Sequence, residues 1–318
     1  MKRFIFAALM TMLTAASAAW SKPPMPQDEF LGYCATGKLA EVSKGIRRKA
    51  DVDLVGASGL SPLLCAAREQ DDPRVIELLI ARGAHVDKAN AQGLTPLMTA
   101  AMANPRVKVT QALLKGGADP RRTDLTGSTA TLLAARHNRS EAVLAALLAA
   151  APDTLERTSS TGQTPLMAAA QNERIEISRL LLAGGADPAR ADNEGRTALS
   201  WAAGNKNTAV LKLFLDLPGA QVNESDERGM NPLMYAVRAN NADAVKLLLE
   251  RGAKADTRSR DGFSAAEMGR NKPDLAHLFP APKRSQTRYS APRRASGVQE
   301  ASPKRGASKK SVPRRKRR

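Results

Sequence analysis

A repeat of about 34 residues is the feature that most limits how this 318-residue chain can fold. A glycine, any residue, then Ser, Thr or Asn, and then Pro or Ala recurs along the sequence. Successive glycines are separated by 34, 34, 35, 33, 34 and 33 residues. These glycines are Gly59, Gly93, Gly127, Gly162, Gly195, Gly229 and Gly262. Chance does not maintain so regular a spacing, so the chain consists of successive copies of one structural unit.

The start of each unit predicts a tight turn followed by a helix. The glycine suits a turn position with positive φ, and an Asn, Asp or Ser three residues earlier is able to brace that turn through its side chain. These bracing residues are Asn90, Asp124, Ser159, Asp192, Asp226 and Ser259. The Ser, Thr or Asn after the glycine is a good N-cap, and Pro suits the first helical position. We expect the helix to end at a left-handed Asn in three units, at Asn104, Asn138 and Asn240.

A second helix is predicted in each unit from apolar residues at helical spacing, as in Val75, Leu78 and Leu79. Glycines followed by Ala close this helix in four units, at Gly83, Gly117, Gly185 and Gly252. A unit of two short helices cannot bury its apolar face alone, so neighbouring units must stack. The aromatic content of 3% also argues against a β-sandwich or barrel. The sequence therefore predicts an all-α solenoid.

Two motifs resemble those of the ankyrin repeat family. They are Thr164-Pro-Leu-Met-Ala-Ala-Ala170 and Leu181-Leu-Ala-Gly-Gly-Ala186. The resemblance covers residues 28–280 as a degenerate N-terminal cap, about six full repeats and a C-terminal cap. It implies helix-turn-helix units with β-turn fingers, and protein binding on a concave groove and on the fingers. The chain departs from the family by lacking its His, in whose place we expect apolar packing by Leu64, Met98, Leu132, Met167 and Met234, with Ser200 in the sixth unit.

The N-terminus has the three-part layout of an export signal. Lys2 and Arg3 precede an apolar run from Phe4 to Leu13, and Ala16-Ser-Ala18 offers a cleavage site. We therefore expect a signal peptide at 1–18, a linker at 19–27 and export to the periplasm of a bacterium. A frayed N-terminal helix of a cytosolic protein is the alternative.

The excess positive charge of the chain, +18 in total, is concentrated in residues 281–318. This segment has 14 basic residues and one acid, Glu300, so we expect a disordered basic tail. Such a tail suits an anionic lipid, a lipopolysaccharide-like surface or nucleic acid, whereas a purely solubilising role is the alternative. The candidate polyanion-binding residues are Arg293, Arg294, Lys304, Arg305, Lys309, Lys310, Arg314, Arg315, Lys316, Arg317 and Arg318.

A column of charged residues recurs two positions before the turn-bracing residue. It consists of Lys88, Arg122, Arg157 and Arg190 in consecutive units, followed by Glu224. Stacked units would place these side chains along the edge formed by the fingers, where they would suit a partner with an acidic face. A set of solvated loop charges without partner preference is the alternative.

No combination of residues indicates catalysis, a cofactor, a metal or a small-molecule substrate. His85, His137 and His277 occupy dissimilar positions in the repeat, and no metalloprotease, hydrolase or phosphate-loop motif occurs. Cys34 and Cys65 fall on the first helices of adjacent units. They are a possible disulfide in an exported protein, and two small buried thiols are the alternative.

The sequence thus predicts a non-enzymatic, protein-binding scaffold of the bacterial periplasm with a tail that binds an anionic surface. Two alternatives stay open. One is a secreted effector that acts on host proteins, and the other is a polyanion or envelope tether that works mainly through the tail.

Overall fold

The structure, a computed structural model, describes residues 25–279. Helices account for the regular structure of these residues, with a single isolated β-bridge between Arg258 and Ser264. The expected signal peptide and basic tail lie outside the described residues. The fold is an all-α solenoid, as predicted, and it is built from pairs of antiparallel helices joined by long turns.

Each repeat contributes a first and a second helix. The first helices are α2 (Gln27–Thr36), α4 (Pro62–Glu69), α6 (Pro96–Ala103), α8 (Ala130–His137), α10 (Pro165–Ala169), α12 (Ala198–Ala203), α14 (Pro232–Arg238) and α16 (Ala265–Arg270). The second helices are α3 (Leu39–Arg47), α5 (Pro73–Ala81), α7 (Val107–Lys115), α9 (Glu141–Ala150), α11 (Ile175–Ala183), α13 (Thr208–Leu215) and α15 (Ala242–Glu250). Two 3₁₀ helices, η1 (Pro152–Glu156) and η2 (Ala276–Leu278), complete the elements.

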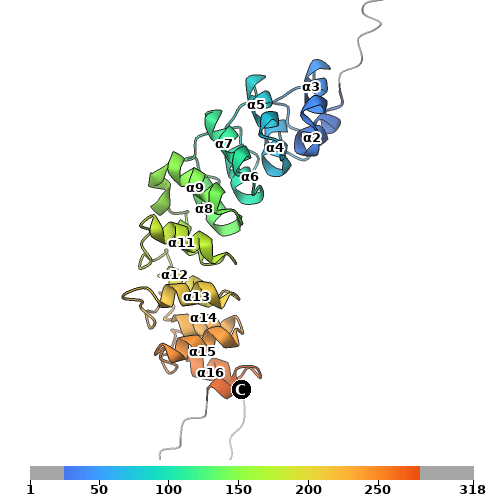
Figure 1. Ribbon diagram of the computed structural model, residues 1–318. Helices are drawn as coiled ribbons and strands as arrows, with labels where there is room; N and C mark the ends of the chain where they lie inside the picture. The colour runs from blue at the N-terminus through green and yellow to red at the C-terminus, as the bar shows by residue number, and fades with distance from the viewer. Residues whose placement is uncertain (1–24, 280–318) are drawn as a thin grey trace, which may run out of the picture. The chain divides into compact units, whose positions relative to one another are not determined.

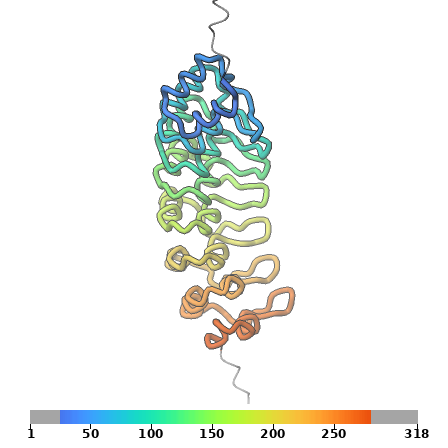
Figure 2. Tube along the Cα trace, turned by 90° about the vertical axis from the view of Figure 1, so that its right-hand side faces the viewer, coloured from blue at the N-terminus to red at the C-terminus, as the bar shows by residue number. Residues whose placement is uncertain are grey.

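In neighbouring repeats, first helices pack against first helices and second helices pack against second helices. Each first helix contacts the first helices before and after it, and the second helices from α3 to α15 do the same (Figure 1). The turns that precede the first helices, which we call the fingers, leave the same side of each helical pair (Figure 2). Met25 is buried and α2 begins at Gln27, so the packed body starts within the expected linker.

The first helices after α2 begin directly after the N-cap residues, as predicted from the sequence. The hydroxyls of Ser61, Thr95, Thr129 and Thr164 each accept a hydrogen bond from the backbone N–H three residues later, at 3.2–3.3 Å. Thr197 makes no such bond. The residues that replace the family's His are all buried, so apolar packing does fill this position, except at Ser200.

A ladder of side-chain amides joins the repeats where each first helix ends. Asn104 Nδ2 donates to the carbonyls of Ala67 and Gln70 in the preceding repeat, at 3.2 and 2.9 Å, and its Oδ1 accepts the Arg106 N–H. Gln70, Asn138, Asn172, Asn205 and Asn241 make equivalent bonds. The expectation that Asn104 and Asn138 adopt left-handed backbone is wrong, because both are extended and act through their side chains; Asn240 is left-handed, with φ of 54°.

A second ladder joins the finger tips through the backbone. The Leu125 N–H donates to the Gln92 carbonyl at 3.2 Å, and the Ser160 N–H donates to the Thr126 carbonyl at 2.9 Å. The same bond recurs in the next three fingers. All seven finger glycines have positive φ, as predicted, and the Oδ1 atoms of Asp124, Asp192 and Asp226 brace their turns. The fingers therefore form a continuous edge whose side chains are held in register.

Candidate functional site

The fingers and the finger side of the first helices form one surface, which we call the inner face. The exposed large apolar side chains of residues 25–279 all lie in fingers: Leu54, Val55, Leu125 and Phe263. Leu125 at the tip of its finger is 77% exposed, and Phe263 is 59% exposed. The large apolar side chains that are exposed in this part of the chain are thus confined to the finger edge.

Two aromatic side chains stand at the same position of adjacent repeats on the inner face. Trp201 on α12 and Tyr235 on α14 are each the sixth residue after a finger glycine, and both are half-buried. The Trp201 indole N–H donates to Asp192 Oδ2 at 3.2 Å, and the Tyr235 hydroxyl donates to Asp226 Oδ2. Each aromatic ring is thus fixed to the carboxylate that braces its own finger.

Arg196 completes this aromatic cluster. Its guanidinium carbon lies 4.1 Å from the centre of the Trp201 ring, a cation–π distance. Its Nε lies 2.9 Å from Asp192 Oδ2, and its Nη2 lies 3.3 Å from Glu194 Oε1. Burial and the Asp226 carboxylate raise the pKa of Tyr235, so the phenol stays a neutral donor. Trp, Tyr and Arg are the residues that most often dominate binding energy at protein interfaces.

A hollow of about 380 Å³ opens beside the cluster. Trp201, Tyr235 and Gly204, which has no side chain, are among the residues that line it. Gln171, Arg196, Ser200, Asn205 and Lys206 complete the lining. The hollow combines aromatic walls with a polar rim, which suits an apolar side chain of another molecule.

The predicted charged column does not form one free strip. Lys88 Nζ lies 3.0 Å from Asp53 Oδ2 and donates to the Asp53 carbonyl at 2.7 Å, and Arg190 Nη1 lies 2.9 Å from Glu156 Oε2. These two cations therefore link successive repeats. Within residues 25–279, Arg122, Arg157 and Glu224 form no ion pair within 4 Å and are exposed. Only these three members of the column present an unpaired charge to a partner.

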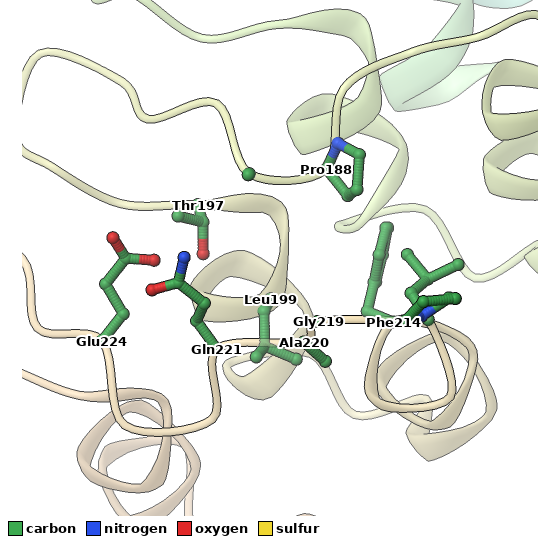
Figure 3. Close-up of a pocket in the computed structure, with 11 residues that line it drawn as sticks. Pro188, Thr197, Leu199, Phe214, Gly219, Ala220, Gln221 and Glu224 are labelled. Carbon is green, nitrogen blue, oxygen red and sulfur yellow. The ribbon is translucent and has the colours of Figure 1, made fainter.

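Glu224 lies at the rim of a second, smaller cavity of about 70 Å³ (Figure 3). Leu199 lines the cavity from α12 and Phe214 from α13, and Pro188 lines it from the preceding finger. Pro218 and Gly219 lie in the turn after α13, which ends at Leu215, and both residues line the cavity. The cavity is too small for more than a small apolar group.

Cys34 and Cys65 are both free thiols in the structure, and both are buried. Burial raises the pKa of each thiol, and the proximity of Cys65 adds to the effect on Cys34. In the described geometry the two residues are separate buried thiols, and the disulfide stays a prediction.

Within residues 25–279, no group of three His, Cys, Asp or Glu residues is placed to hold a metal ion. His85 Nδ1 lies 2.7 Å from Asp53 Oδ2 in an exposed ion pair. Across the same residues, none of the helices has both the length and the apolar character that crossing a bilayer requires.

The aromatic cluster and the amide ladder were missed by the sequence reasoning. A signal for the cluster was present: at the sixth position after the glycine the earlier repeats have Cys65, Thr99, Leu133 and Ala168, and only then do two large aromatic residues follow. An aromatic pair at a surface position of a chain with 3% aromatic residues was the informative deviation.

Comparison with known proteins agrees with this architecture. A family model described as ankyrin repeats (3 copies) matches residues 31–124, 103–192 and 184–260. No curated protein sequence matches the chain.

Proposed function

Because the chain belongs to the ankyrin repeat family, whose members generally act as non-catalytic binding scaffolds, we propose that it binds a protein partner on its inner face. The cluster of Arg196, Trp201 and Tyr235 is the observation that carries this proposal. These side chains are held rigidly by Asp192 and Asp226, so little conformational entropy is lost when a partner covers them.

The exposed apolar side chains of the fingers also support partner binding on the inner face. The exposed Leu125 and Phe263 indicate a contact surface longer than the aromatic cluster alone. The unpaired Arg122 lies in the same finger as Leu125, and the unpaired Arg157 lies in the next finger. Charges at such a rim steer a partner and fix its orientation more than they add to affinity. An acidic surface on the partner would complement these two cations.

Position-specific crosslinking tests the proposal. A photo-crosslinking amino acid is placed at Leu125 on the inner face or at Lys212, which is exposed on the second helix α13. We expect the full-length mature protein to crosslink to one discrete protein from Leu125 and not from Lys212. The crosslink should weaken when Trp201 is replaced by Ala. Equal crosslinking from both positions, or none from Leu125, contradicts the proposal.

The compartment and the tail form the second part of the proposal. We infer from the N-terminal signal that the scaffold works in the bacterial periplasm and that residues 281–318 hold it at an anionic surface. N-terminal sequencing of the protein recovered from a periplasmic fraction should begin at residue 19. Deletion of 281–318 should abolish salt-sensitive binding to vesicles containing anionic lipid, whereas unchanged binding rules out this role.

Two other functions make different predictions. A secreted effector acting on host proteins would be found in host cells during infection, and finding the protein only in the periplasm excludes it. A polyanion or envelope tether working mainly through the tail would keep its binding after Trp201→Ala and lose it without 281–318.

A further inference from the structure

Arg136 on α8 is a half-buried cation of the inner face without an acidic partner. Its Nη2 donates to Gln163 Oε1 of the next finger, which is the only acceptor that residues 25–279 bring to this guanidinium. Its Nε is buried and has no hydrogen-bond partner. Most other arginines near the fingers, such as Arg190 and Arg196, pair with carboxylates.

Asp124 is the acid that acts electrostatically on Arg136, but the two side chains form no ion pair within 4 Å. Asp124 Oδ1 instead accepts the N–H groups of Thr126 and Ser128 and the Thr126 hydroxyl. Burial lowers the pKa of Arg136 because it removes water from around the guanidinium. A half-buried guanidinium in this state gains from an external carboxylate, because charge-assisted hydrogen bonds are strongest away from water.

Arg136 and the aromatic hollow lie along one line of the inner face. Arg136, Gln171 and Gly204 are each the ninth residue after a finger glycine, in three consecutive repeats. Their helices α8, α10 and α12 pack in that order. Gln171, in the repeat next to Arg136, already lines the near edge of the hollow. At about 10 Å per packed helix, Arg136 lies about 10 Å from this edge and about 20 Å from the Trp201 side of the hollow.

We propose that the inner face of repeats four to seven recognises a partner segment that places a carboxylate on Arg136 and an apolar side chain in the Trp201–Tyr235 hollow. This inference rests on the proposed function and specifies the partner's chemistry. Nucleic acid suits the site less well, because the anionic Asp192, Glu194 and Asp226 line or flank the cluster and would repel phosphates.

Selection from a displayed library of random 16-residue peptides tests the proposal on the full-length mature protein. We expect enriched peptides to share an Asp or Glu and a large apolar residue. The separation should be about six residues for an extended peptide or about 13 for a helical one, from rises of about 3.3 and 1.5 Å per residue. An enriched peptide is then synthesised and its affinity is measured with a set of variants.

Two variants remove one determinant each, and each has a matched control. Arg136→Gln should weaken the peptide about 10- to 100-fold, whereas Arg139→Gln, at an exposed arginine three residues further on, should leave the affinity unchanged. Gly204→Leu should fill the hollow and weaken binding about tenfold or more, whereas Gly204→Ala should not. A side chain at Gly204 is tolerated because its φ is −79° and its nearest neighbour, the Trp201 carbonyl oxygen, would lie 3.6 Å from the added Cβ.

The outcomes separate this inference from the proposed function. Enriched peptides without a shared acid, or affinity unaffected by Arg136→Gln, overturn the inference, and crosslinking from Leu125 would still support protein binding. Competition by a 20-nucleotide single-stranded DNA at equal concentration also overturns it in favour of nucleic acid. No enrichment together with no inner-face crosslink overturns both proposals.

Discussion

The Trp201 indole N–H donates to the same Asp192 carboxylate that braces the finger turn at Gly195. The Tyr235 hydroxyl and Asp226 repeat this relationship in the next unit. Each aromatic ring is thereby fixed to the turn of its own finger, so the finger and the ring respond together to a change in either.

Removing these donors should destabilise the C-terminal repeats slightly. Tyr235→Phe leaves Asp226 Oδ2 without its phenol donor in a buried site, and we expect a loss of about 1–2 kcal/mol in the free energy of unfolding. Urea unfolding followed by circular dichroism measures it. Tyr33→Phe is the control, because its hydroxyl donates to Glu29 at an exposed position, and a loss equal to that of Tyr235→Phe would contradict the buried bond.

The close approach of neighbouring fingers predicts different costs at two glycines with the same backbone. Gly59 and Gly127 have φ of 75° and 74°. A Cβ on Gly127 would lie 2.8 Å from the Ser160 backbone nitrogen, whereas a Cβ on Gly59 would meet nothing within 4 Å. Gly59→Ala should cost about 1–2 kcal/mol from backbone strain alone, and Gly127→Ala should cost about 1–3 kcal/mol more. If urea unfolding shows equal losses of stability for the two variants, the close contact between neighbouring fingers at Gly127 is contradicted.

Local features of the fold followed from the sequence. The positive φ of the finger glycines and the capping by Ser61 or Thr95 depend on residues within four positions, and the repeat shows them several times over. The role of Asn104 did not follow, because its partners, the Ala67 and Gln70 carbonyls, belong to the preceding repeat and become visible only when the units are stacked.

In the candidate site too, contacts between repeats could not be predicted from the sequence. The column of cations is correctly placed on the fingers, but Asp53 and Glu156, which neutralise Lys88 and Arg190, lie about one repeat earlier in the chain. Charge in a single column does not reveal such pairs. The unpaired state of Arg136 is likewise a property of the stack, since it depends on whether any carboxylate of the described residues comes within ion-pair distance of its guanidinium.

The amide ladder predicts that Asn138 contributes more to the free energy of unfolding than its exposed neighbour His137 does. Asn138→Ala removes two bonds to the Ala101 and Asn104 carbonyls and one cap on the Ser140 N–H, all at buried or half-buried positions. We expect a loss of about 2–3 kcal/mol in the free energy of unfolding, whereas His137→Ala should change it by less than about 0.5 kcal/mol. A small effect at Asn138 would mean that water replaces the ladder.

The ion pairs of Asp53 predict a pH-dependent contribution to stability. Partial burial alone would raise the pKa of Asp53, but hydrogen bonds from Lys88 and His85 outweigh it and hold the pKa below its usual value. A depressed pKa stabilises the fold above the unfolded-state pKa of about 3.9, and this stabilisation is lost as the pH falls through the folded-state pKa. Asp53→Asn should therefore cost up to about 1 kcal/mol at pH 7 and progressively less below about pH 4.

The pKa of Asp87 is shifted in the opposite direction to that of Asp53, so Asp87 should have the opposite effect on how stability depends on pH. Burial raises its pKa, even though it accepts the Asp119 N–H, so ionisation of Asp87 opposes folding above the unfolded-state pKa. Stability of the wild type relative to Asp87→Asn should rise as the pH falls. Urea unfolding of both variants at several pH values compares them, and parallel pH profiles would contradict the assigned shifts.

The burial of Cys34 and Cys65 predicts their reactivity in protein purified without reductant. A thiol must be ionised and accessible to be alkylated, and burial opposes both by raising the pKa of each thiol and shielding it. Iodoacetamide at pH 8 should therefore leave both residues unmodified in the native state and alkylate both in urea, as read by mass spectrometry. If urea exposes no alkylatable thiol until a reductant is added, the two residues are bonded, and the N-terminal cap is covalently stapled to the next repeat.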